Sequence, residues 1–409
     1  MPIALLQYLY RLNAIALKYA ARMLNIPKPL LFTGTQAIDD LLLFMSSSGS
    51  KRPLIVTDNA LLDLGTIEPI QAYFKQHNIA YDIFSDIQPD PDERVIIAGV
   101  NALRTAGNDT VLAIGGGSVL DTAKMIAGLA HKASLQEKHI RRRQGLLKLW
   151  RKSVPLYVIP TTAGTGSEAT MAAIITNAEN NQKYPVISPI ITADAAAVCG
   201  NIMTGLPAHM TAATGMDALT HAIEAYTSKN ASSETNRYAL AAVRLIFNNL
   251  KDCYNQGDNV QARQQMALAS TYAGLAFNKA GVGYVHAIAH QLGARYHIAH
   301  GLANAMVLVA IMKLNQPACE RQFAELATAI GIQASNPQAA SFAFIDAVTM
   351  LCHNLAIPQH VEPLQIDDCP VIAKAALKEA HFLYAVPVYI DEEQCVEILQ
   401  QLIKPRYNS

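Results

Sequence analysis

The chain has 409 residues, of which 51% are hydrophobic and 16% are charged, and 32 Lys and Arg residues balance 32 Asp and Glu residues. This composition excludes intrinsic disorder, because disordered chains are poor in apolar residues and rich in charge. The zero net charge argues against a protein whose whole surface binds nucleic acid. The length predicts two or three domains with apolar cores.

The six cysteines lie far apart, and no Cys-x-x-Cys pair occurs among them. This spacing favours neither a thiolate zinc site nor a disulfide framework. No run reaches the ~18 apolar residues that are needed to span a bilayer. A location in the reducing cytoplasm is therefore expected.

The N-terminal residues 1–28 are predicted to form an amphipathic extension. Apolar residues recur at helical spacing between Leu5 and Met23, and Pro27 and Pro29 end the pattern.

Residues 29–205 are predicted to form an α/β dinucleotide-binding domain with a mostly parallel sheet. Alternating strands and helices favour βαβ crossovers and a sheet covered on both faces. The expected strands are 53–58, 81–86, 110–115 and 155–160, with a hairpin at 172–177 and 184–190. The expected helices between them are 66–77, 92–106 and 118–132.

Residues 206–409 are predicted to form a second, all-helical domain, because β-branched runs disappear and helical periodicity continues to the end. The expected helices are 210–228, 233–255, 260–279, 282–297, 301–315, 318–330, 338–354, 370–383 and 391–403. A ligand site between the two domains is expected.

Two glycine- and hydroxyl-rich segments follow predicted strands. Gly115-Gly116-Gly117-Ser118 opens a helix, where backbone N–H groups and the helix dipole favour a bound pyrophosphate. The segment from Pro160 to Glu168 offers small hydroxyl donors for a second phosphate or ribose contact. Alone, the first could be an ordinary turn and the second a helix cap. Together they favour a nucleotide site.

Asp58 closes the first strong strand. A carboxylate at this position can hold a ribose diol and repel a 2′-phosphate, which would select NAD over NADP. A solvated turn aspartate is the alternative.

A set of carboxylate and imidazole groups has the spacing of metal ligands. Asp217 and His221 are four residues apart on one predicted helix, and His286 and His290 repeat this spacing. Four of the twelve histidines lie within 286–300. Such a set suits Zn²⁺ or Fe²⁺. Spacing alone favours His286 with His290 as the second pair, and does not exclude His297.

Five segments follow one another in a characteristic order: GGGSVLDTAK (115–124), PTTAGTGSEAT (160–170), KYPVISP (183–189), LPAHMTAATGMDALTHAIEAY (206–226) and HAIAHQLGARYHIAHGLANA (286–305). Through these segments the sequence resembles the iron-containing (group III) alcohol dehydrogenase family. The resemblance implies a dinucleotide-binding α/β domain followed by a helical domain, which is a dehydroquinate synthase-like architecture.

The resemblance also implies roles for particular residues. The residues that match the metal ligands are Asp217, His221, His286 and His300, whereas His290 matches a histidine beside the nicotinamide. The residues that match cofactor contacts are Asp58, Asp90, Gly116, Gly117, Ser118, Thr161, Thr162, Thr165 and Lys183.

The chain departs from the family pattern at several places. Asp90 stands where many members have Asn, and Val119-Leu120 replaces a Pro-containing dipeptide. The stretch LYAVPVYIDEEQ (383–394) lacks an Asn-Pro-Arg sequence, which predicts that the end of the helical domain differs.

The resemblance implies an oxidoreductase that interconverts an alcohol and an aldehyde or ketone by hydride transfer with NAD(H) and one divalent metal, Fe²⁺ or Zn²⁺. His290 is the candidate proton carrier, with packing beside the nicotinamide as its alternative role. A polyol dehydrogenase or a dehydroquinate synthase-like lyase of the same superfamily is the alternative function. A homo-oligomer, such as a dimer, is expected.

Residues 138–152 carry seven Lys and Arg residues and no acid. Such a run usually forms a solvated face, but together with residues 1–25 it could contact an anionic membrane surface. A non-catalytic nucleic-acid or membrane binder would leave the glycine-rich turns and clustered histidines unexplained, so no nucleic-acid partner is expected.

Overall fold

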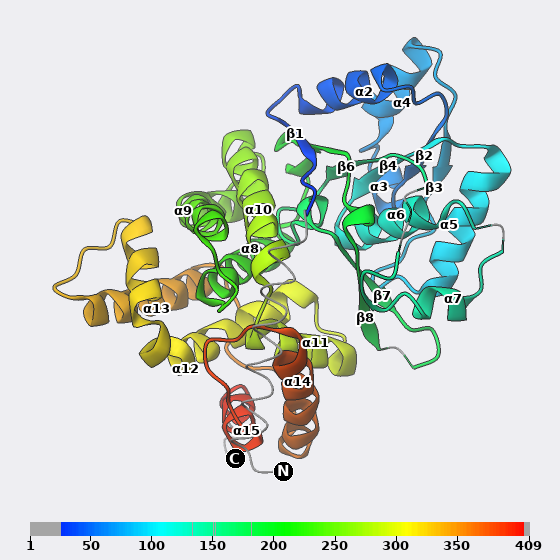
Figure 1. The fold of residues 1–409 in the computed structure, drawn as a ribbon. Coiled ribbons are helices and arrows are strands. Elements are labelled where there is room, and N and C mark those ends of the chain that lie inside the picture. Colours follow the sequence, from blue (N-terminus) through cyan, green and yellow to red (C-terminus); the bar gives the residue numbers. More distant parts are fainter. Residues whose placement is uncertain (1–25, 133, 150, 152, 181, 405–409) are drawn as a thin grey trace. The chain divides into compact units, whose positions relative to one another are not determined.

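A computed structural model describes residues 26–404, apart from positions 133, 150, 152 and 181 (Figure 1). The predicted extension over 1–28 therefore lies almost entirely outside the described residues. The described chain divides into two compact units. The sheet unit comprises residues 26–205 and 260–274, and the helical unit comprises 206–259 and 275–404.

The sheet unit is built on a six-stranded sheet in which every neighbouring pair is parallel. In spatial order the strands are β1 (Leu30–Thr33), β9 (Ala195–Val198), β6 (Leu156–Pro160), β4 (Thr110–Gly115), β2 (Pro53–Val56) and β3 (Asp82–Phe84). The chain passes from β2 to β3 on one side and then returns to β4 on the other side of β2. The direction of strand order thus reverses at β2 and β4.

Helices cover both faces of this sheet, as the alternating pattern predicts. Leu54 and Val56 of β2 belong to an apolar core that includes α5 (Glu93–Ala106) and α6 (Gly117–Leu129). Ile55, between them, belongs to a second core with α2 (Ala37–Ser47) and α4 (Glu68–Gln76). Successive side chains of a strand point to opposite faces, so an all-apolar strand is buried on both sides.

The predicted hairpin is confirmed as an antiparallel pair, β7 (Ala172–Thr176) with β8 (Lys183–Ile187). It belongs to a small second sheet with β5 (Gly145–Leu146). The short helices of this unit are α3 (Asn59–Asp63), α7 (Glu137–Arg141), η1 (Ser167–Ala169), η2 (Pro189–Ile191) and η3 (Asn201–Met203).

Three strands were not predicted from the sequence: the two-residue β5, and β1 and β9 of the six-stranded sheet. β9 has the sequence AAAV, and three alanines lack the β-branched side chains that indicate a strand, although all four residues are buried. β1 has four residues, and both of its ends are exposed. Tertiary packing, and not local propensity, makes these segments strands.

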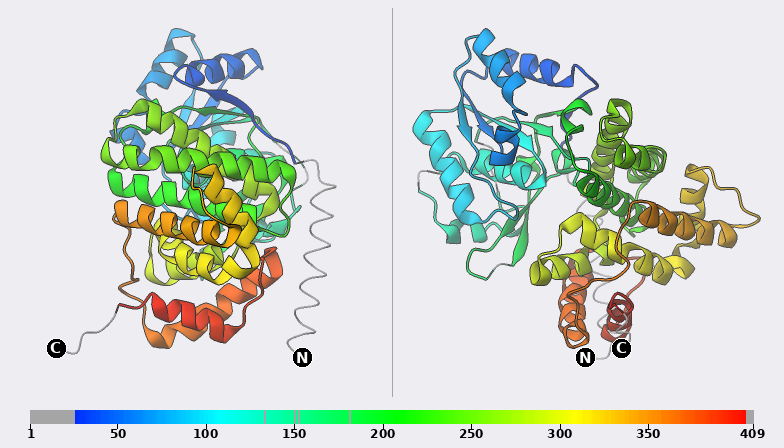
Figure 2. Two further views of the ribbon diagram at one scale, coloured as in Figure 1. Left: turned by 90° about the vertical axis from the view of Figure 1, so that its left-hand side faces the viewer. Right: turned by 180° about the vertical axis from the view of Figure 1, so that it is seen from behind.

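Residues 206–404, all of which the structure describes, contain no strand. The helices of the helical unit are α8 (Ala208–Thr227), α9 (Ser233–Asn255), the end of α10 (Val260–Ala280), α11 (Tyr284–Tyr296), α12 (His300–Ala329), α13 (Pro337–Asn354), η4 (Ile366–Asp368), α14 (Cys369–Leu383) and α15 (Glu392–Gln401). Helix α12 packs against both α8 and α13, and α8 packs against α9 (Figure 2).

The predicted helices 301–315 and 318–330 are joined into α12, with a break at Cys319, whose backbone is not helical. The break follows Pro317, which cannot donate the helical hydrogen bond and clashes with the preceding turn. By length and composition α12 could span a membrane. However, 61% of the 18-residue apolar segment that makes it long enough is buried in the fold. We interpret it as a core helix.

Helix α10 is shared between the two units. Its residues 260–274 belong with the sheet, although the periodicity of the sequence assigns the whole helix to the helical domain. Gln264 explains this, because its side chain accepts a hydrogen bond from Gly200 N at 2.9 Å and donates one to Val198 O at 3.0 Å.

Candidate functional site

The candidate cofactor residues of the sheet unit cluster at one edge. Gly116 and Thr161 directly follow β4 and β6, and Asp58 lies two residues after the end of β2. These three strands are neighbours in the parallel sheet. The carboxyl ends of parallel strands share one edge, and strand order reverses between β2 and β4. In open α/β sheets, nucleotides bind outside the carboxyl ends of the strands at such a reversal.

The two glycine- and hydroxyl-rich segments pack directly against each other at this edge. A Cβ atom on Gly117 would lie 2.8 Å from Thr165 Cγ2, so only glycine fits without a shift. A Cβ on Gly116 would lie 3.5 Å from Thr162 Cγ2. Gly116 precedes α6, and no side chain caps the first N–H groups of that helix. Such a helix start suits an anion.

Asp58 caps a helix in this structure. Its Oδ1 accepts a hydrogen bond from Leu61 N at 2.9 Å, at the start of α3. This capping role was not predicted from the sequence. A role for the same carboxylate towards a ribose stays a prediction.

A buried lysine on α6 forms hydrogen bonds with the segment that follows β6. The Lys124 side chain is fully buried, and its Nζ donates to Ser167 Oγ at 2.7 Å, Thr170 Oγ1 at 2.9 Å and Ala172 O at 2.6 Å. Asp121, one turn earlier on α6, accepts from Ser167 Oγ at 2.6 Å. Burial lowers the pKa of Lys124, and the nearby Asp121 carboxylate opposes this. Ser167 and Thr170 therefore anchor the loop.

Helix α10 holds the same loop from another side. Gly166 N donates to Ser270 Oγ at 3.2 Å, and Thr271 Oγ1 donates to Glu168 Oε1 at 2.7 Å. A Cβ on Gly166 would lie 2.7 Å from the backbone of Gly274. The loop after β6 is thus fixed by both α6 and α10.

Asp90 and Lys183 form an ion pair with each other, with 2.6 Å between Lys183 Nζ and Asp90 Oδ1. Asp90 has a φ of 59°, in the left-handed region that Asn and Asp adopt more readily than other residues with side chains. The two predicted cofactor residues are thus adjacent.

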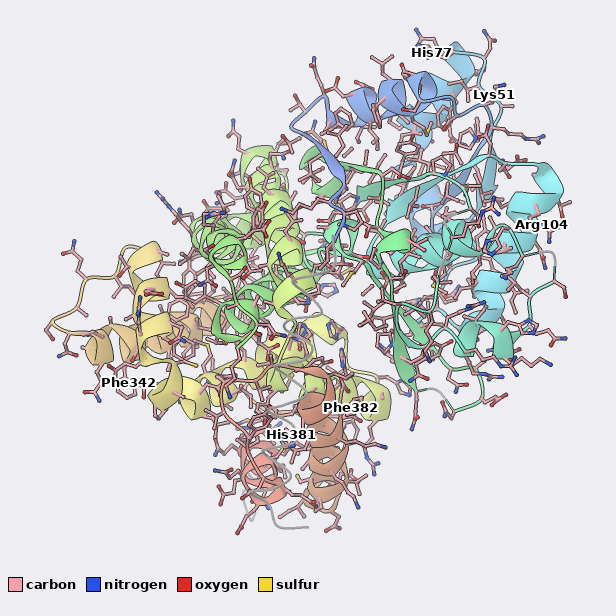
Figure 3. The ribbon with its side chains drawn as sticks, in the orientation of Figure 1. Lys51, His77, Arg104, Phe342, His381 and Phe382 are labelled. Carbon is pink, nitrogen blue, oxygen red and sulfur yellow. The ribbon has the colours of Figure 1, made fainter. Side chains whose placement is uncertain are left out.

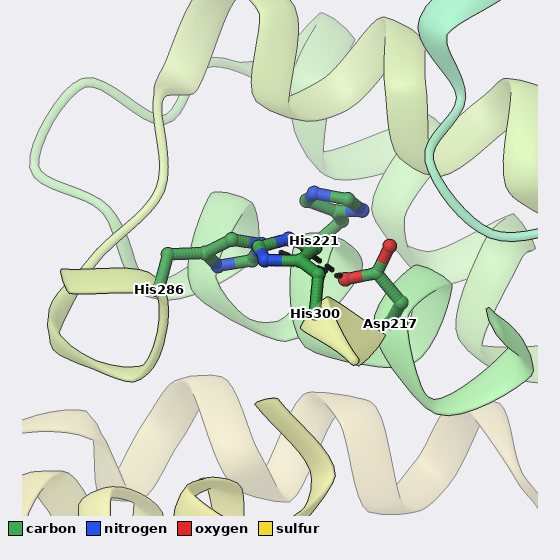
Figure 4. Close-up of side chains that lie close together, drawn as sticks. All are labelled: Asp217, His221, His286 and His300. Carbon is green, nitrogen blue, oxygen red and sulfur yellow. Dashed lines mark ion pairs between the residues drawn. The ribbon is translucent and has the colours of Figure 1, made fainter. Parts of the chain in front are cut away.

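Three helices of the helical unit bring the metal set together (Figure 4). Asp217 and His221 lie on α8, His286 lies on the first turn of α11, and His300 is the first residue of α12. One ligand atom from each of the four lies within 4.8 Å of every other. His290 and His297 are not in this group, and His297 ends α11 in an exposed, left-handed conformation.

The centre is buried and is suited to a cation. Asp217 Oδ1 lies 3.5 Å from His300 Nε2 and 3.8 Å from His286 Nε2. Among the described residues, His286 Nε2 is buried without a hydrogen-bond partner. Burial and the neighbouring histidines hold the pKa of His286 well below its usual value, so this imidazole is neutral. One carboxylate and three imidazoles fit a divalent ion such as Fe²⁺ or Zn²⁺.

Two further polar residues hold these ligands. The Glu224 carboxylate accepts from His286 Nδ1 at 2.6 Å, and Asn304 Nδ2 donates to Asp217 Oδ1 at 2.7 Å. Burial raises the pKa of Glu224 to about 8, whereas its backbone donors at Gly283 and Val285 favour the charged form.

His290 lies beside the centre. Its ring stacks on that of His300 at 5.3 Å between centroids. Its Nδ1 is 2.7 Å from Glu379 Oε1, which also accepts from Tyr384 Oη at 2.6 Å. Burial raises the pKa of Glu379, but His290 and these hydrogen bonds outweigh it and hold the pKa below the usual value.

Sequence reasoning did not single out Glu224, Asn304, Glu379 or Tyr384. Glu224 carries a usable signal, because it is a lone carboxylate in an otherwise apolar stretch, three residues after His221. Glu379 carries none, because it lies on α14, 89 residues from His290. Tyr384 belongs to the stretch that departs from the family pattern. A second pair of polar side chains also joins α11 to α14: Tyr284 Oη and His381 Nε2 are 2.8 Å apart (His381 is labelled in Figure 3).

The basic segment is partly neutralised in the structure. Arg141 pairs with Glu179 at 2.7 Å and with Glu137 at 3.9 Å. Leu149 is buried in the core of the sheet unit, whereas Leu146 is 40% exposed. Membrane contact through this segment stays a prediction.

Comparison with known protein families identifies the family to which the chain belongs. The family described as iron-containing alcohol dehydrogenase matches residues 28–199, and its C-terminal domain matches residues 211–403. The chain belongs to the iron-containing alcohol dehydrogenase family. The predicted α/β and helical architecture is that of this family.

Relatives in the iron-containing alcohol dehydrogenase family cover nearly the whole chain. A 1,3-propanediol dehydrogenase of Klebsiella pneumoniae is 37% identical over 359 residues, which cover 86% of this chain and 92% of the relative. An NAD-dependent methanol dehydrogenase of Bacillus methanolicus is 35% identical over 350 residues, covering 85% of this chain and 91% of the relative. A crystal structure of 1,3-propanediol oxidoreductase superposes with a TM-score of 0.88 at 35% identity, over 93% of this chain and all of that one.

The chain is accordingly an oxidoreductase that interconverts an alcohol and an aldehyde or ketone, and a metal and NAD(H) are implied for it by its family. The alternative of a polyol dehydrogenase or a lyase of the wider superfamily is not favoured by these relatives.

Proposed function

We propose that this protein transfers hydride between a small alcohol and NAD(H), using one divalent metal held by Asp217, His221, His286 and His300. The observation that carries the proposal is the approach of four donor atoms, from three helices, to within 4.8 Å of one another. A bound divalent ion would supply Lewis acidity towards an alcohol or carbonyl oxygen.

NAD(H) would be held at the carboxyl edge of the sheet and would supply the hydride acceptor or donor. The proposed contacts are Asp58, Asp90, Gly116, Gly117, Ser118, Thr161, Thr162, Thr165 and Lys183. The close packing of Gly117 on Thr165 leaves backbone N–H groups and small side chains for a pyrophosphate. The printed name of the Bacillus methanolicus relative, an NAD-dependent enzyme, supports the choice of cofactor.

His290 is the proposed proton carrier of the site. Its Nδ1 faces Glu379 at 2.7 Å, which leaves Nε2 as the nitrogen that can exchange a proton with substrate or solvent. Glu379 acts as its positioning residue, because its carboxylate faces Nδ1 and orients the ring.

We propose Fe²⁺ as the metal, with Zn²⁺ as the second candidate, because both accept one carboxylate and three imidazoles. We further propose a cytoplasmic homo-oligomer, a dimer in the simplest case. The relatives that act on propanediol and methanol support a short alcohol as substrate.

The test combines metal analysis with an activity panel. Protein purified without oxygen is expected to contain about one divalent metal per chain and to reduce NAD⁺ with short primary alcohols or diols. It should also oxidise NADH with the matching aldehydes. Stoichiometric metal without turnover of any alcohol or aldehyde, at several NAD(H) and NADP(H) concentrations, would refute the proposal.

The D58G variant tests the cofactor preference. Removal of the carboxylate should relax the preference for NAD towards NADP, because the repulsion of a 2′-phosphate is lost. Ratios of kcat/KM for NAD and NADP measure the effect, and an increase of about tenfold in the relative use of NADP corresponds to ~1.4 kcal/mol.

Because Asp58 also caps α3, the Tm is measured in parallel. A D58S variant keeps a capping oxygen without the charge. An unchanged ratio in both variants would argue against the ribose role.

A further inference from the structure

Glu224 joins two of the helices that carry the metal set. It lies on α8, three residues after His221 and seven after Asp217, so the three side chains share one face of the helix. Its side chain is 7% exposed. The carboxylate reaches the start of α11, where it accepts hydrogen bonds from Gly283 N at 2.8 Å, Val285 N at 2.7 Å and His286 Nδ1 at 2.6 Å.

The start of α11 has no cap of its own. Its N-cap residue is Gly283, which has no side chain, and no side-chain cap bond is made by that position. Glu224 fills this role from another helix, because its two side-chain oxygens accept from N–H groups that a helix start leaves without partners. A Cβ on Gly283 would lie 2.8 Å from Glu224 Oε1, so the close approach requires glycine.

The same carboxylate decides which nitrogen of His286 carries hydrogen. Both Glu224 oxygens accept backbone N–H groups, so the carboxyl group faces His286 Nδ1 as an acceptor. An acceptor at Nδ1 favours the tautomer with hydrogen on Nδ1, which leaves the Nε2 lone pair for a metal. This Nε2 is the buried atom that has no hydrogen-bond partner among the described residues, and it lies 3.8 Å from Asp217 Oδ1.

We propose that Glu224 is a positioning residue that sets the metal affinity of the centre by fixing the orientation and tautomer of His286 before the metal binds. The inference rests on the proposed metal centre and deepens it. Glu224 is not one of the four ligands, and it acts on the centre through its contact with His286. Hydrogen-bond partners of this kind contribute about 10- to 100-fold to metal affinity.

The E224Q variant separates this role from simple helix capping. A glutamine has one accepting oxygen where the carboxyl group has two, so it cannot accept from Val285 N on one side and from Gly283 N and His286 Nδ1 on the other. When its oxygen accepts from Val285 N, its amide nitrogen faces His286 as a donor. Opposite His286 Nδ1 that donor favours hydrogen on Nε2, which is the atom that must bind the metal. The substitution therefore keeps shape and part of the cap while it reverses the tautomer.

E325Q is the matched control. Glu325 is another carboxylate of the helical unit that accepts a hydrogen bond from α8, from Tyr226 Oη at 2.5 Å. It also pairs with Arg321, and among the described residues it makes no hydrogen bond or ion pair with any of the four ligands. The same chemical change at Glu325 should leave metal affinity within about twofold of the wild type.

The experiment measures Zn²⁺ and Co²⁺ affinity of the full-length protein by competition with a chromophoric chelator, together with the Tm of each variant. E224Q is expected to bind both metals about 10- to 100-fold more weakly than wild type and E325Q. In metal-free protein with ¹⁵N-labelled histidine, the His286 signals should change from the Nδ1–H to the Nε2–H pattern in E224Q only. A purely structural role would lower the Tm without this change.

Equal metal affinity of E224Q and the wild type would overturn the inference. If E224Q does not fold, E224D replaces it, because the shorter carboxylate keeps the charge but cannot reach His286 Nδ1 as closely. It should also lose metal affinity, and unchanged affinity of a folded E224D would equally overturn the inference. Failure of the wild-type protein to bind any metal stoichiometrically would instead refute the proposed function.

Discussion

Replacement of His286 by alanine should remove metal retention and activity together. His286 is one of four ligands, its Nε2 is buried, and only three donors remain after the substitution. The change also leaves Glu224 without one of its three donors. Because a Lewis-acid metal contributes several kcal/mol to such a reaction, kcat/KM should fall by about 10³-fold or more. Metal content after dialysis and NAD-coupled turnover measure the two effects.

The matched control for H286A is H297N. His297 belongs to the same histidine-rich stretch, but it is exposed at the end of α11, where its φ is 56°. Asparagine tolerates this left-handed conformation, so the backbone need not change. H297N should retain wild-type metal content and activity. Full activity of H286A with stoichiometric metal would contradict the assignment, and so would loss of metal in H297N.

The sequence predicts those strands and helices whose own residues carry a clear pattern of apolar side chains. Alternating apolar runs locate β2, β4 and β6, and their order along the chain implies a parallel sheet. The strand β9 was missed because its AAAV sequence becomes a strand only through its neighbours β1 and β6. Helical periodicity also could not show that the first part of α10 packs with the sheet unit.

The same limit applies to the candidate site: residues with a local sequence signal were predicted, and residues that only the folded chain brings together were not. The ligand spacing and family motifs predicted the four residues that the structure brings together, whereas spacing alone favoured His290 over His300. Local sequence could not show that the Lys124 side chain is fully buried and that its Nζ donates hydrogen bonds to Ser167 and Thr170. These contacts join residues more than 40 positions apart, and only the folded chain brings them together.

The E379Q variant should impair proton transfer while leaving the metal centre intact. Glu379 accepts hydrogen bonds from His290 Nδ1, Tyr384 Oη and Gln291 Nε2, and none of these is in the four-residue metal group. The substitution removes the carboxylate that faces His290 Nδ1, and the amide nitrogen, which is a donor, can reverse the tautomer of this ring. We expect kcat to fall by about 10²-fold, the lower end of what general acid–base catalysis contributes, with unchanged metal content.

The Y384F variant is the graded control for E379Q. It removes one hydrogen bond to Glu379 and keeps both the carboxylate and the contact of that carboxylate with His290. A smaller loss of kcat is expected than in E379Q, at equal metal content. If E379Q retained the wild-type kcat, His290 would not depend on this carboxylate and packing beside the nicotinamide would be its better-supported role.

The pH dependence of stability gives an independent check on Glu379. Its pKa is held below the usual value in the folded protein, although burial opposes this, because His290 and the hydrogen bonds favour the carboxylate. Above the unfolded pKa, at about 4.3, both states are ionised and the stabilisation is complete. As the pH falls through the folded pKa, the carboxylate is protonated and the stabilisation is lost. The difference in Tm between wild type and E379Q should therefore be largest near neutral pH and shrink below about pH 4. A constant difference down to that pH would mean that Glu379 supports the fold by packing, without a charged interaction with His290.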